Sequence, residues 1–394
     1  MSFYADPAFF VLAALAVIPA IVLGCREKPL VNYTLGVSAV FLVLLFFYDW
    51  AQGAAFLFFL VLATVLCRWV QRLFQRGAPH AVGLYRVALA ATIAPLAIYK
   101  VAAVFDGNLL GFVGISYITF KAVQVLIEVR DGLIKEMGLR DYVAFLIFFT
   151  PFTSGPIMRS RPFAERVHAH LTRADYLSGL ARGGVMFLVG AFYKFVLAAF
   201  FGWAQWFAPE YIGTADALHA VGGELAIAFF YGMNLFFDFA GYSLMAIGLG
   251  AAFGVEVPQN FHAPFRSIDI KDFWNRWHIT LSFWLRDFVF MRFTRACMKR
   301  KVFTSRVTTA CMGYILNMAL MGAWHGLTVD YLIYGLYHGL LLAACEVFQK
   351  KSKFYKAHKN DRAFKVVSWA VTMIAIFFGF ALFNGQISRI VLGG

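Results

Sequence analysis

Residues 307–348 read VTTACMGYILNMALMGAWHGLTVDYLIYGLYHGLLLAACEVF, which is two apolar runs joined by a short turn that contains His325. Each run has the roughly 17 to 25 residues that a helix needs to cross a bilayer. Further runs of this kind occur near 8–24, 31–48, 54–70, 84–104, 109–128, 183–206, 222–253 and 366–384. The sequence therefore predicts an all-α, polytopic integral membrane protein with about 10–11 transmembrane helices plus re-entrant and interfacial helices.

The composition indicates that lipid is the main solvent of this chain. Of its 394 residues, 61% are hydrophobic and only 14% are charged, which excludes an ordinary soluble globular domain. We expect a single membrane-embedded domain over residues 1–394. Within it we expect peripheral N-terminal spans in 1–80, a core over 85–348, and a basic linker and last span in 349–394.

The distribution of charge predicts the topology. The formal net charge is +14, and the basic residues lie in short loops, where they set orientation, attract anionic lipids or meet an acidic cytosolic partner rather than nucleic acid. Because the linker 350–365 is strongly basic, we expect it in the cytoplasm and both termini outside a plasma or inner membrane. The segment 204–221, with Glu210 and Asp216 and no Lys or Arg, is then expected on the outer face.

Several sequence motifs are absent, and their absence argues against some classes of function. The five cysteines are scattered without metal-ligand spacing, so neither a disulfide nor a metal site is predicted. The N-terminal MSFYADP has no positive n-region, so we expect the first span to remain in the mature protein. There is no Walker A loop, and no internal repeat supports a secondary transporter.

Residues 142–156 form an apolar run that is too short for a simple span. It ends in Thr153-Ser154-Gly155-Pro156, which breaks a helix. We expect a re-entrant segment whose non-helical backbone is shielded by protein or lines a water-filled cavity. Ser154 lacks a neighbouring His and acid in a nucleophile pattern, so it is a candidate only for lining a site.

The segment DFWNRWHITLSFWLRDFVFMRF, residues 272–293, has a helical amphipathic pattern. At about 100° per residue, its apolar and polar side chains separate into two arcs, which predicts one helix lying in the membrane interface. His278 falls on the apolar arc, where a packed histidine is the ordinary interpretation. The apolar arc holds Trp274, Trp277, His278, Leu281, Trp284, Leu285 and Phe288, and the polar arc holds Asn275, Arg276, Thr280, Ser282, Arg286 and Asp287.

Three further ionisable residues stand within or beside apolar runs. His325 lies in Met-Gly-Ala-Trp-His-Gly, where flanking glycines allow close approach, so it is either a functional group or an interfacial histidine in a tight connection. His338 is a weaker candidate that we expect to pack or to form a hydrogen bond. Asp238 needs a partner such as an Arg or Tyr, and either a structural role or a place in the site remains open.

These motifs together resemble the membrane-bound O-acyltransferase superfamily. The resemblance rests on FFDFAGYSLMAIG at 236–248, WNRWHITLSFWLRDFVFMRF at 274–293, and MGAWHG at 321–326 with YGLYHG downstream. Within that superfamily, GISYITFKAVQVLIEVRDG at 114–132 and SGPIMRSRPF at 154–163 are similar to the branch that transfers D-alanine to teichoic acids.

The resemblance implies that His325 is the catalytic histidine and His278 the second histidine of the site. It also implies a D-alanyl thioester on the phosphopantetheine arm of a small acidic carrier protein, with no other cofactor, and a teichoic acid or related envelope polymer as acceptor. His325 would then take the proton of the attacking hydroxyl. His278, Asn275 or a backbone amide remain alternatives for binding the oxyanion, and Trp274 and Trp324 are expected to line the site.

The basic stretch after the amphipathic segment is a candidate docking surface for the carrier protein. Acidic carriers meet basic surfaces faster, although positive-inside bias alone also explains such charges. The residues expected there are Arg292, Arg295, Met298, Lys299, Arg300 and Val302, flanked by Lys301, Phe303 and Arg306.

Two other functions fit the same motifs. One is O-acetylation of an exported or cell-wall polysaccharide, as in the alginate branch of the superfamily. The other is a transporter or proton channel in which His278, His325 and Asp238 line a path. Loss of acyl transfer in a His325 variant would separate the enzyme from the channel.

Overall fold

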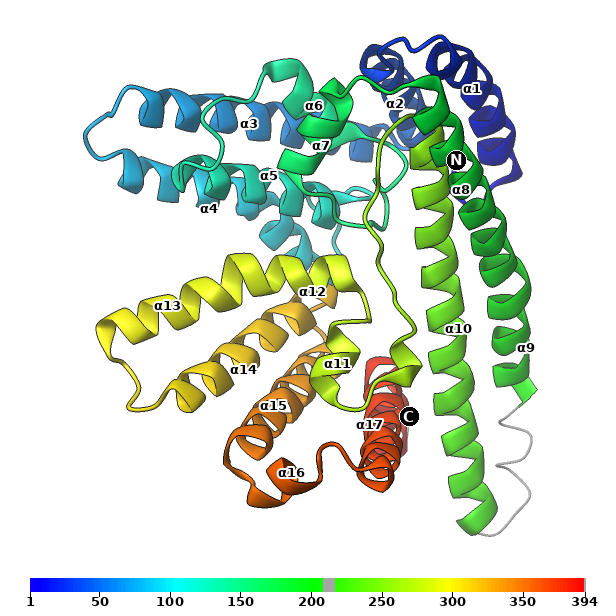
Figure 1. Ribbon diagram of the computed structural model, residues 1–394, viewed down its shortest axis with the longest axis vertical. Helices are drawn as coiled ribbons and strands as arrows, with labels where there is room; N and C mark the ends of the chain where they lie inside the picture. Colours follow the sequence, from blue (N-terminus) through cyan, green and yellow to red (C-terminus); the bar gives the residue numbers. More distant parts are fainter. Residues whose placement is uncertain (208–216, 393–394) are drawn as a thin grey trace. The chain divides into compact units, whose positions relative to one another are not determined.

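The computed structural model describes residues 1–207 and 217–392, and helices are the only regular secondary structure among them (Figure 1). Glu210 and Asp216, which the charge pattern assigns to the outer face, lie outside the described residues. The prediction of an all-α membrane protein is confirmed.

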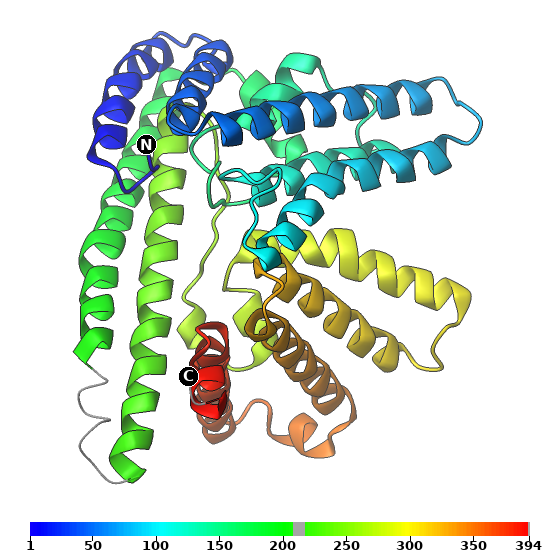
Figure 2. The same ribbon diagram turned by 180° about the vertical axis from the view of Figure 1, so that it is seen from behind.

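The described chain divides into two compact units, and the first comprises residues 1–191 and 242–258. Its core is aromatic, since Phe149 stacks on Phe41 with ring centroids 4.5 Å apart and meets Phe253 edge-on at 5.3 Å. Helices α3, α4 and α5 pack on one another (Figure 2). The helices of unit 1 are α1 (Pro7–Cys25), α2 (Val31–Phe46), α3 (Trp50–Gln75), α4 (Ala81–Ala102), η1 (Ala103–Phe105), α5 (Ile115–Arg130), α6 (Leu139–Ile147), α7 (Ser160–His168), α8 (Arg173–Phe192) and the end of α10 (Ala217–Ala252).

The second unit comprises residues 192–241 and 259–394. Its most extensive helix pair within the described ranges is α14 with α15. The helices of unit 2 are the π-helical turn η2 (Tyr193–Ala198), α9 (Ala199–Phe207), most of α10, η4 (Pro264–Arg266), α11 (Ile270–Trp274), α12 (Ile279–Leu285), the π-helical turn η5 (Arg286–Phe290), α13 (Met291–Arg300), α14 (Arg306–His325), α15 (Val329–Lys351), α16 (Lys353–His358), α17 (Arg362–Phe383) and α18 (Gln386–Leu392).

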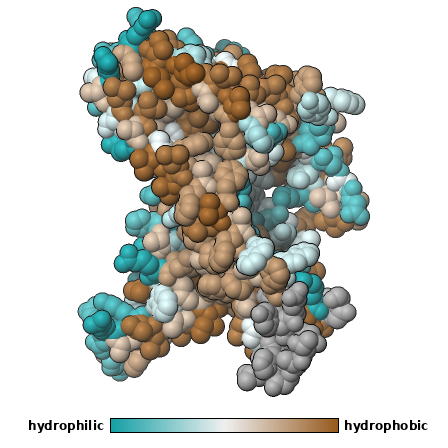
Figure 3. Space-filling view, turned by 90° about the vertical axis from the view of Figure 1, so that its right-hand side faces the viewer, coloured by the Kyte–Doolittle hydropathy of each residue, from teal (hydrophilic) through white to brown (hydrophobic). Residues whose placement is uncertain are grey.

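Eight helical segments in the described part of the chain are long and apolar enough to cross a membrane. They are α1, α3, α4 with η1, α8 with η2 and α9, α10, α14, α15 and α17. The face that carries α1 and α8 is covered largely by hydrophobic side chains (Figure 3). Leu15 of α1 and Val185 and Leu188 of α8 are exposed. Such a surface suits contact with lipid acyl chains rather than water.

The other two expected spans, 31–48 and 109–128, correspond to α2 and α5, each of 16 residues. Helix α5 is buried on nearly every side and carries the buried polar residues Lys121, Gln124 and Glu128. The Lys121 ammonium donates to the carbonyl of Phe145 at 3.0 Å. This helix is therefore shielded by protein, which explains why it tolerates polar groups.

The short apolar run at 142–156 is only partly helical, because α6 ends at Ile147, before the predicted helix-breaking residues. The following backbone is irregular and largely buried, with Phe149 N–H donating to Ser38 Oγ at 3.4 Å. Non-helical backbone shielded by protein is what the sequence predicts for this segment.

Glycines set the close contact between α14 and α15. A Cβ atom at Gly322 would lie 2.4 Å from the carbonyl oxygen of Tyr331 and 3.0 Å from the Cα of Gly335. One at Gly335 would lie 2.5 Å from the carbonyl oxygen of Met318. Both neighbours are backbone atoms, so small residues are required on both helices. This contact fixes the last turn of α14, which ends at His325.

We expect Gly322→Ala to destabilise the protein by about 1–3 kcal/mol, because the added methyl group forces the two backbones apart. Thermal unfolding in detergent, followed by circular dichroism, measures the effect. Gly184→Ala in α8 is the matched control, since a Cβ atom there meets nothing within 4 Å. Equal stability of the two variants would contradict the prediction.

Candidate active site

The segment that carries His278 is broken where the sequence predicts one continuous helix over 272–293. In its place stand α11, α12, η5 and α13, with His278 in the gap between α11 and α12. The break has a tertiary cause. The backbone N–H of Ile279 donates to the carbonyl of Asn260 at 2.9 Å, and His262 N–H donates to the carbonyl of Arg276 at 2.9 Å. The loop at 260–262 thus takes groups that a continuous helix would pair within itself, and the single-helix prediction is wrong.

Burial along this segment follows the predicted apolar arc except at Thr280 and Phe288. Asn275 and Arg286, on the predicted polar arc, are exposed. Thr280, also expected on the polar arc, is instead buried, with 7% of its surface exposed. Six of the seven residues of the apolar arc are buried, namely Trp274, Trp277, His278, Leu281, Trp284 and Leu285.

Asn260 fixes the tautomer of His278. Its Oδ1 accepts a hydrogen bond from the backbone N–H of Thr280 at 3.3 Å and another from the Thr280 hydroxyl at 2.8 Å. Because a backbone N–H only donates, this atom of Asn260 must be the oxygen. His278 Nδ1, 3.1 Å from the same oxygen, therefore carries the proton and donates it. His278 Nε2 is left as a buried lone pair with no hydrogen-bond partner among the described residues.

His278 is held in an unusual backbone conformation and in its neutral state. It has φ 43° and ψ 50°, in the left-handed region that costs a residue with a Cβ atom about 1–3 kcal/mol. Burial lowers the pKa of His278 to about 3, and charge repulsion from a protonated His325 acts in the same direction. The imidazole is thus neutral at physiological pH and can accept a hydrogen bond through Nε2.

His325 is the last residue of α14 and is half-buried in a cage of aromatic rings. The Phe383 ring meets it edge-on at 4.9 Å between centroids, and the Tyr331 ring lies 5.9 Å away. The Trp324 ring contacts both histidines, with its centroid 4.6 Å from that of His325 and 6.1 Å from that of His278. Unit 2 therefore brings His278, Trp324 and His325 together, as expected for one site.

A cleft of about 220 Å³ lies in the same unit, between the segment from α11 to η5 and helices α14 and α15, and none of His278, Trp324 and His325 is among its lining residues. Trp274 and Asn275 line it together with Asn317 and Met321, and Met321 precedes His325 by one turn of α14. Asn317 Oδ1 and Trp274 Nε1 are buried and have no hydrogen-bond partner within residues 1–207 and 217–392. The walls of the cleft therefore contain an unpaired acceptor and an unpaired donor.

His338 packs in the wall of the same region, as the sequence predicts. It is 1% exposed, and its ring meets the Trp274 ring at 5.2 Å with an interplanar angle of 89°. It therefore supports Trp274 from behind the cleft, because edge-to-face pairs fix the relative orientation of two rings.

Asp238 and Ser154 lie in other surroundings. Asp238 is exposed and pairs with Lys194 of η2, so its partner is a lysine rather than the Arg or Tyr that we expected. Ser154 belongs to unit 1, where its backbone N–H donates to the Tyr242 hydroxyl at 3.1 Å. Both remain predictions as site-lining residues.

The residues of the candidate docking surface gather on α13 and its end. Thr294 and Cys297 are buried, which turns the opposite face of α13 outward. Arg292 differs from the other predicted members, since it is half-buried with its guanidinium 5.9 Å from the centre of the Phe288 ring. The exposed members are Arg295, Met298, Lys299, Arg300, Lys301, Val302 and Arg306.

A partly buried ion pair that sequence reasoning missed connects α11 to α15. Lys271 pairs with Glu346 and also donates to Gln349 Oε1 at 2.9 Å, and Gln349 Nε2 donates to Asp269 Oδ2 at 3.0 Å. Burial would lower the pKa of Lys271, but the hydrogen bond and charge of Glu346 raise it above its usual value, so this lysine stays charged. Glu346, a carboxylate inside an apolar run, is the sequence signal that could have predicted such a partner.

Comparison with known proteins finds relatives over most of this chain. The chain is 36% identical to teichoic acid D-alanyltransferase of Bacillus subtilis, over 98% of each protein, and 35% identical to that of Streptococcus thermophilus, over 97% of this chain and 94% of the relative. It is 33% identical to a probable alginate O-acetylase of Pseudomonas syringae, over 70% of this chain and 49% of the relative.

The match to a family model covers most of the helices described above. The model of MBOAT, the membrane-bound O-acyltransferase family, matches residues 81–384, which include His278, Trp324 and His325. The chain therefore belongs to the membrane-bound O-acyltransferase family.

Proposed function

We propose that this acyltransferase moves D-alanine from a carrier-protein thioester to a hydroxyl of teichoic acid or a related envelope polymer. The observation that supports this choice is the similarity to teichoic acid D-alanyltransferases over nearly the full length of both proteins. The alginate O-acetylases match only 70% of this chain and about half of their own length, so polysaccharide O-acetylation is the alternative.

In the proposed reaction His325 acts as general base. A neutral imidazole accepts the proton of the acceptor hydroxyl while its oxygen attacks the thioester carbonyl, and a tetrahedral oxyanion forms. The C–S bond then breaks, the thiolate leaves and takes up the proton, and the D-alanyl ester remains on the polymer. Because His278 carries its proton on Nδ1, its Nε2 accepts a hydrogen bond and does not donate one to the oxyanion. Another donor must stabilise that charge.

We further propose that the cleft between the α11 to η5 segment and helices α14 and α15 receives the phosphopantetheine arm of the carrier. The arm is elongated and contains two amide groups, which suit the free donor of Trp274 and the free acceptor of Asn317. The carrier brings the arm, so the enzyme itself needs no bound cofactor. Met321, at the end of the cleft nearest His325 along α14, would then lie close to the thioester.

The exposed surface of α13 is the proposed docking site for an acidic carrier protein. It combines the cations Arg295, Lys299 and Arg300 with the exposed apolar residues Met298 and Val302. Charges of this kind speed encounter, and apolar side chains hold the complex once it has formed.

We expect Lys299→Glu with Arg300→Glu to lower kcat/KM for the carrier protein by roughly tenfold, because the two acidic residues repel an acidic partner. The loss should shrink at high ionic strength. Lys353→Glu with Lys356→Glu in α16 changes the net charge equally at other exposed lysines. Equal losses in the two double variants would exclude α13 as the docking site.

A transfer assay tests the function as a whole. Membranes containing the protein are supplied with the same carrier protein charged either with radiolabelled D-alanine or with radiolabelled acetate, and label in the envelope polymer is measured. D-alanyl label alone supports the proposal. Acetyl label alone would replace it with polysaccharide O-acetylation, and ion flux without acyl transfer would favour the channel.

A further inference from the structure

Unit 1 contains a second cleft, of about 380 Å³, that has no part in the chemistry proposed for unit 2. It opens beside the loop between α1 and α2 and is closed by α6, by α7 and by the segment that follows α10. Its volume falls within the roughly 300–1,000 Å³ of small-molecule sites. Helix α1 is long and apolar enough to cross a membrane and ends at Cys25, so the cleft lies at the end of a membrane-spanning helix.

The lining of this cleft is divided into a cationic rim and an apolar interior. Lys28, Arg140 and His170 at the rim are exposed, whereas Phe163 and Phe253 in the interior are buried. Glu27 is the one carboxylate among the lining residues, against three Lys or Arg and two His. The cleft is thus amphipathic and carries a positive charge at its mouth.

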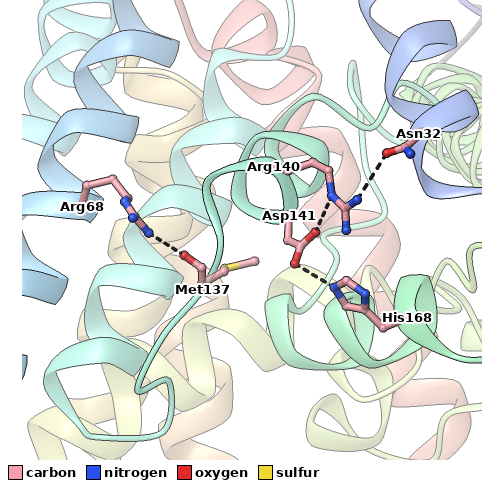
Figure 4. Close-up of polar contacts among 6 residues, drawn as sticks. All are labelled: Asn32, Arg68, Met137, Arg140, Asp141 and His168. Atoms are coloured by element: carbon pink, nitrogen blue, oxygen red, sulfur yellow. Dashed lines mark hydrogen bonds and ion pairs between the residues drawn. The ribbon is translucent and has the colours of Figure 1, made fainter.

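Hydrogen bonds hold part of the rim in place. Arg140 of α6 donates to Asp141 at 3.3 Å and to Asn32 of α2 at 3.4 Å, while His168 Nε2 of α7 lies 2.7 Å from the other oxygen of Asp141 (Figure 4). Asp141 is therefore shared between Arg140 and His168. These contacts connect three helices around the opening and neutralise one of its charges.

Two other cations of the lining are not neutralised in this way. Arg166 Nε is buried and has no hydrogen-bond partner in the part of the chain that the structure describes. The Lys28 side chain is exposed. Glu27 Oε1 accepts a hydrogen bond from the backbone N–H of Arg173 at 2.8 Å. Lys28 and Arg166 thus bring positive charge to the cleft that the described side chains do not neutralise, and an anionic ligand would complement this charge.

We propose that this cleft binds an anionic phospholipid of the surrounding membrane. The phosphate lies against Lys28 and Arg166, and part of an acyl chain packs on Phe163 and Phe253. Basic pockets beside membrane spans are suited to lipid headgroups. A soluble anion would leave the apolar interior unfilled, and a folded acidic protein would not enter a concave site of this size.

Native mass spectrometry of the detergent-solubilised full chain tests the proposal. The probes are phosphatidylglycerol, phosphatidylcholine of the same acyl chains, and inorganic phosphate. We expect the wild-type protein to retain phosphatidylglycerol in preference to phosphatidylcholine. Each cation near an anionic lipid contributes a factor of about five, so Lys28→Gln with Arg166→Gln should lower this retention by about 25-fold.

Two further variants separate the specific site from general attraction and from misfolding. Lys359→Gln with Lys365→Gln removes the same charge from exposed positions of the basic linker and should leave retention within about twofold of wild type. Leu35→Trp keeps every charge but fills the interior of the cleft, and it should also weaken retention of the lipid.

Three results would overturn the proposal. The first is equal retention of the two lipids by the wild-type protein. The second is equal loss in the two charge-removing double variants. The third is displacement of phosphatidylglycerol by millimolar inorganic phosphate with no effect of Leu35→Trp, which would identify a soluble anion as the occupant.

Discussion

Replacing His325 by alanine is expected to lower the rate of acyl transfer by roughly 10²–10⁴-fold, the usual contribution of a general base. The variant loses the group that takes the hydroxyl proton, while the ring cage of Phe383, Trp324 and Tyr331 remains. Label transferred from D-alanyl carrier protein to envelope polymer, at matched amounts of enzyme in the membrane, measures the effect.

His358→Ala is the control for this experiment, because the His358 side chain contacts the carbonyl and the ring of Phe354 within its own helix, α16. It should keep nearly full activity. Carrier binding by the His325 variant should stay within a few-fold of wild type, which separates a lost base from a lost fold. Full transfer by His325→Ala would refute the mechanism.

Replacing His278 by asparagine is expected to lower transfer by roughly 10- to 100-fold, because the hydrogen bond that Nε2 accepts during the reaction is lost, at a cost of about 1–3 kcal/mol. The stability of the protein should change little. Asparagine tolerates the left-handed backbone found at this position. Its Nδ2–H can replace Nδ1–H in the bond to Asn260, so the substitution removes little besides the Nε2 lone pair.

The pH profile gives a second readout for this variant. The pKa of His278 is about 3, well below the ordinary value, so the unfolded chain binds its proton first as the pH falls. His278 therefore costs stability below about pH 6.5 and stays neutral throughout the range of activity. We expect His278→Asn to lower the rate without moving the pH profile between about pH 5 and 8. If either limb of the pH–rate profile shifts in this variant relative to wild type, His278 itself titrates in the range of activity.

Asn260→Leu distinguishes positioning from packing. It leaves Thr280 N–H, the Thr280 hydroxyl and His278 Nδ1 without their shared acceptor, so it should reduce both stability and activity. If His278→Asn keeps its stability while Asn260→Leu loses stability, the Nε2 atom of His278 acts in the reaction. If both variants are equally unstable, His278 serves mainly to stabilise the fold.

Hydropathy predicted the long spans because lipid contact demands apolar side chains over a fixed length. It could not foresee that α5 would be enclosed by protein, where Lys121 is tolerated through a bond to a backbone carbonyl. The re-entrant character of the segment after α6 followed from Gly155 and Pro156, although the helix ends earlier than they require.

For the site, the order of the motifs carried more information than their periodicity. Helical periodicity placed His278 on a continuous helix, and tertiary bonds from Asn260 and His262 broke that helix. Asn260 and Asn317 were missed because an isolated asparagine has no periodic signal. A partner for Asp238 was predicted, but not that it would be Lys194, because that lysine is distant in sequence.

The π-helical turn at Arg286–Phe290 decides what the following helix presents to its surroundings. In an unbroken helix at about 100° per residue, Arg295 and Lys299 would fall on the same arc as the buried Leu281 and Trp284. One wide turn holds an extra residue and shifts the phase of everything after it. The basic residues consequently point outward and Cys297 points inward. One extra residue in this turn thus gives the helices before and after it different orientations: the apolar side chains of α12 pack in the core, and the basic side chains of α13 stay exposed, where a partner could contact them.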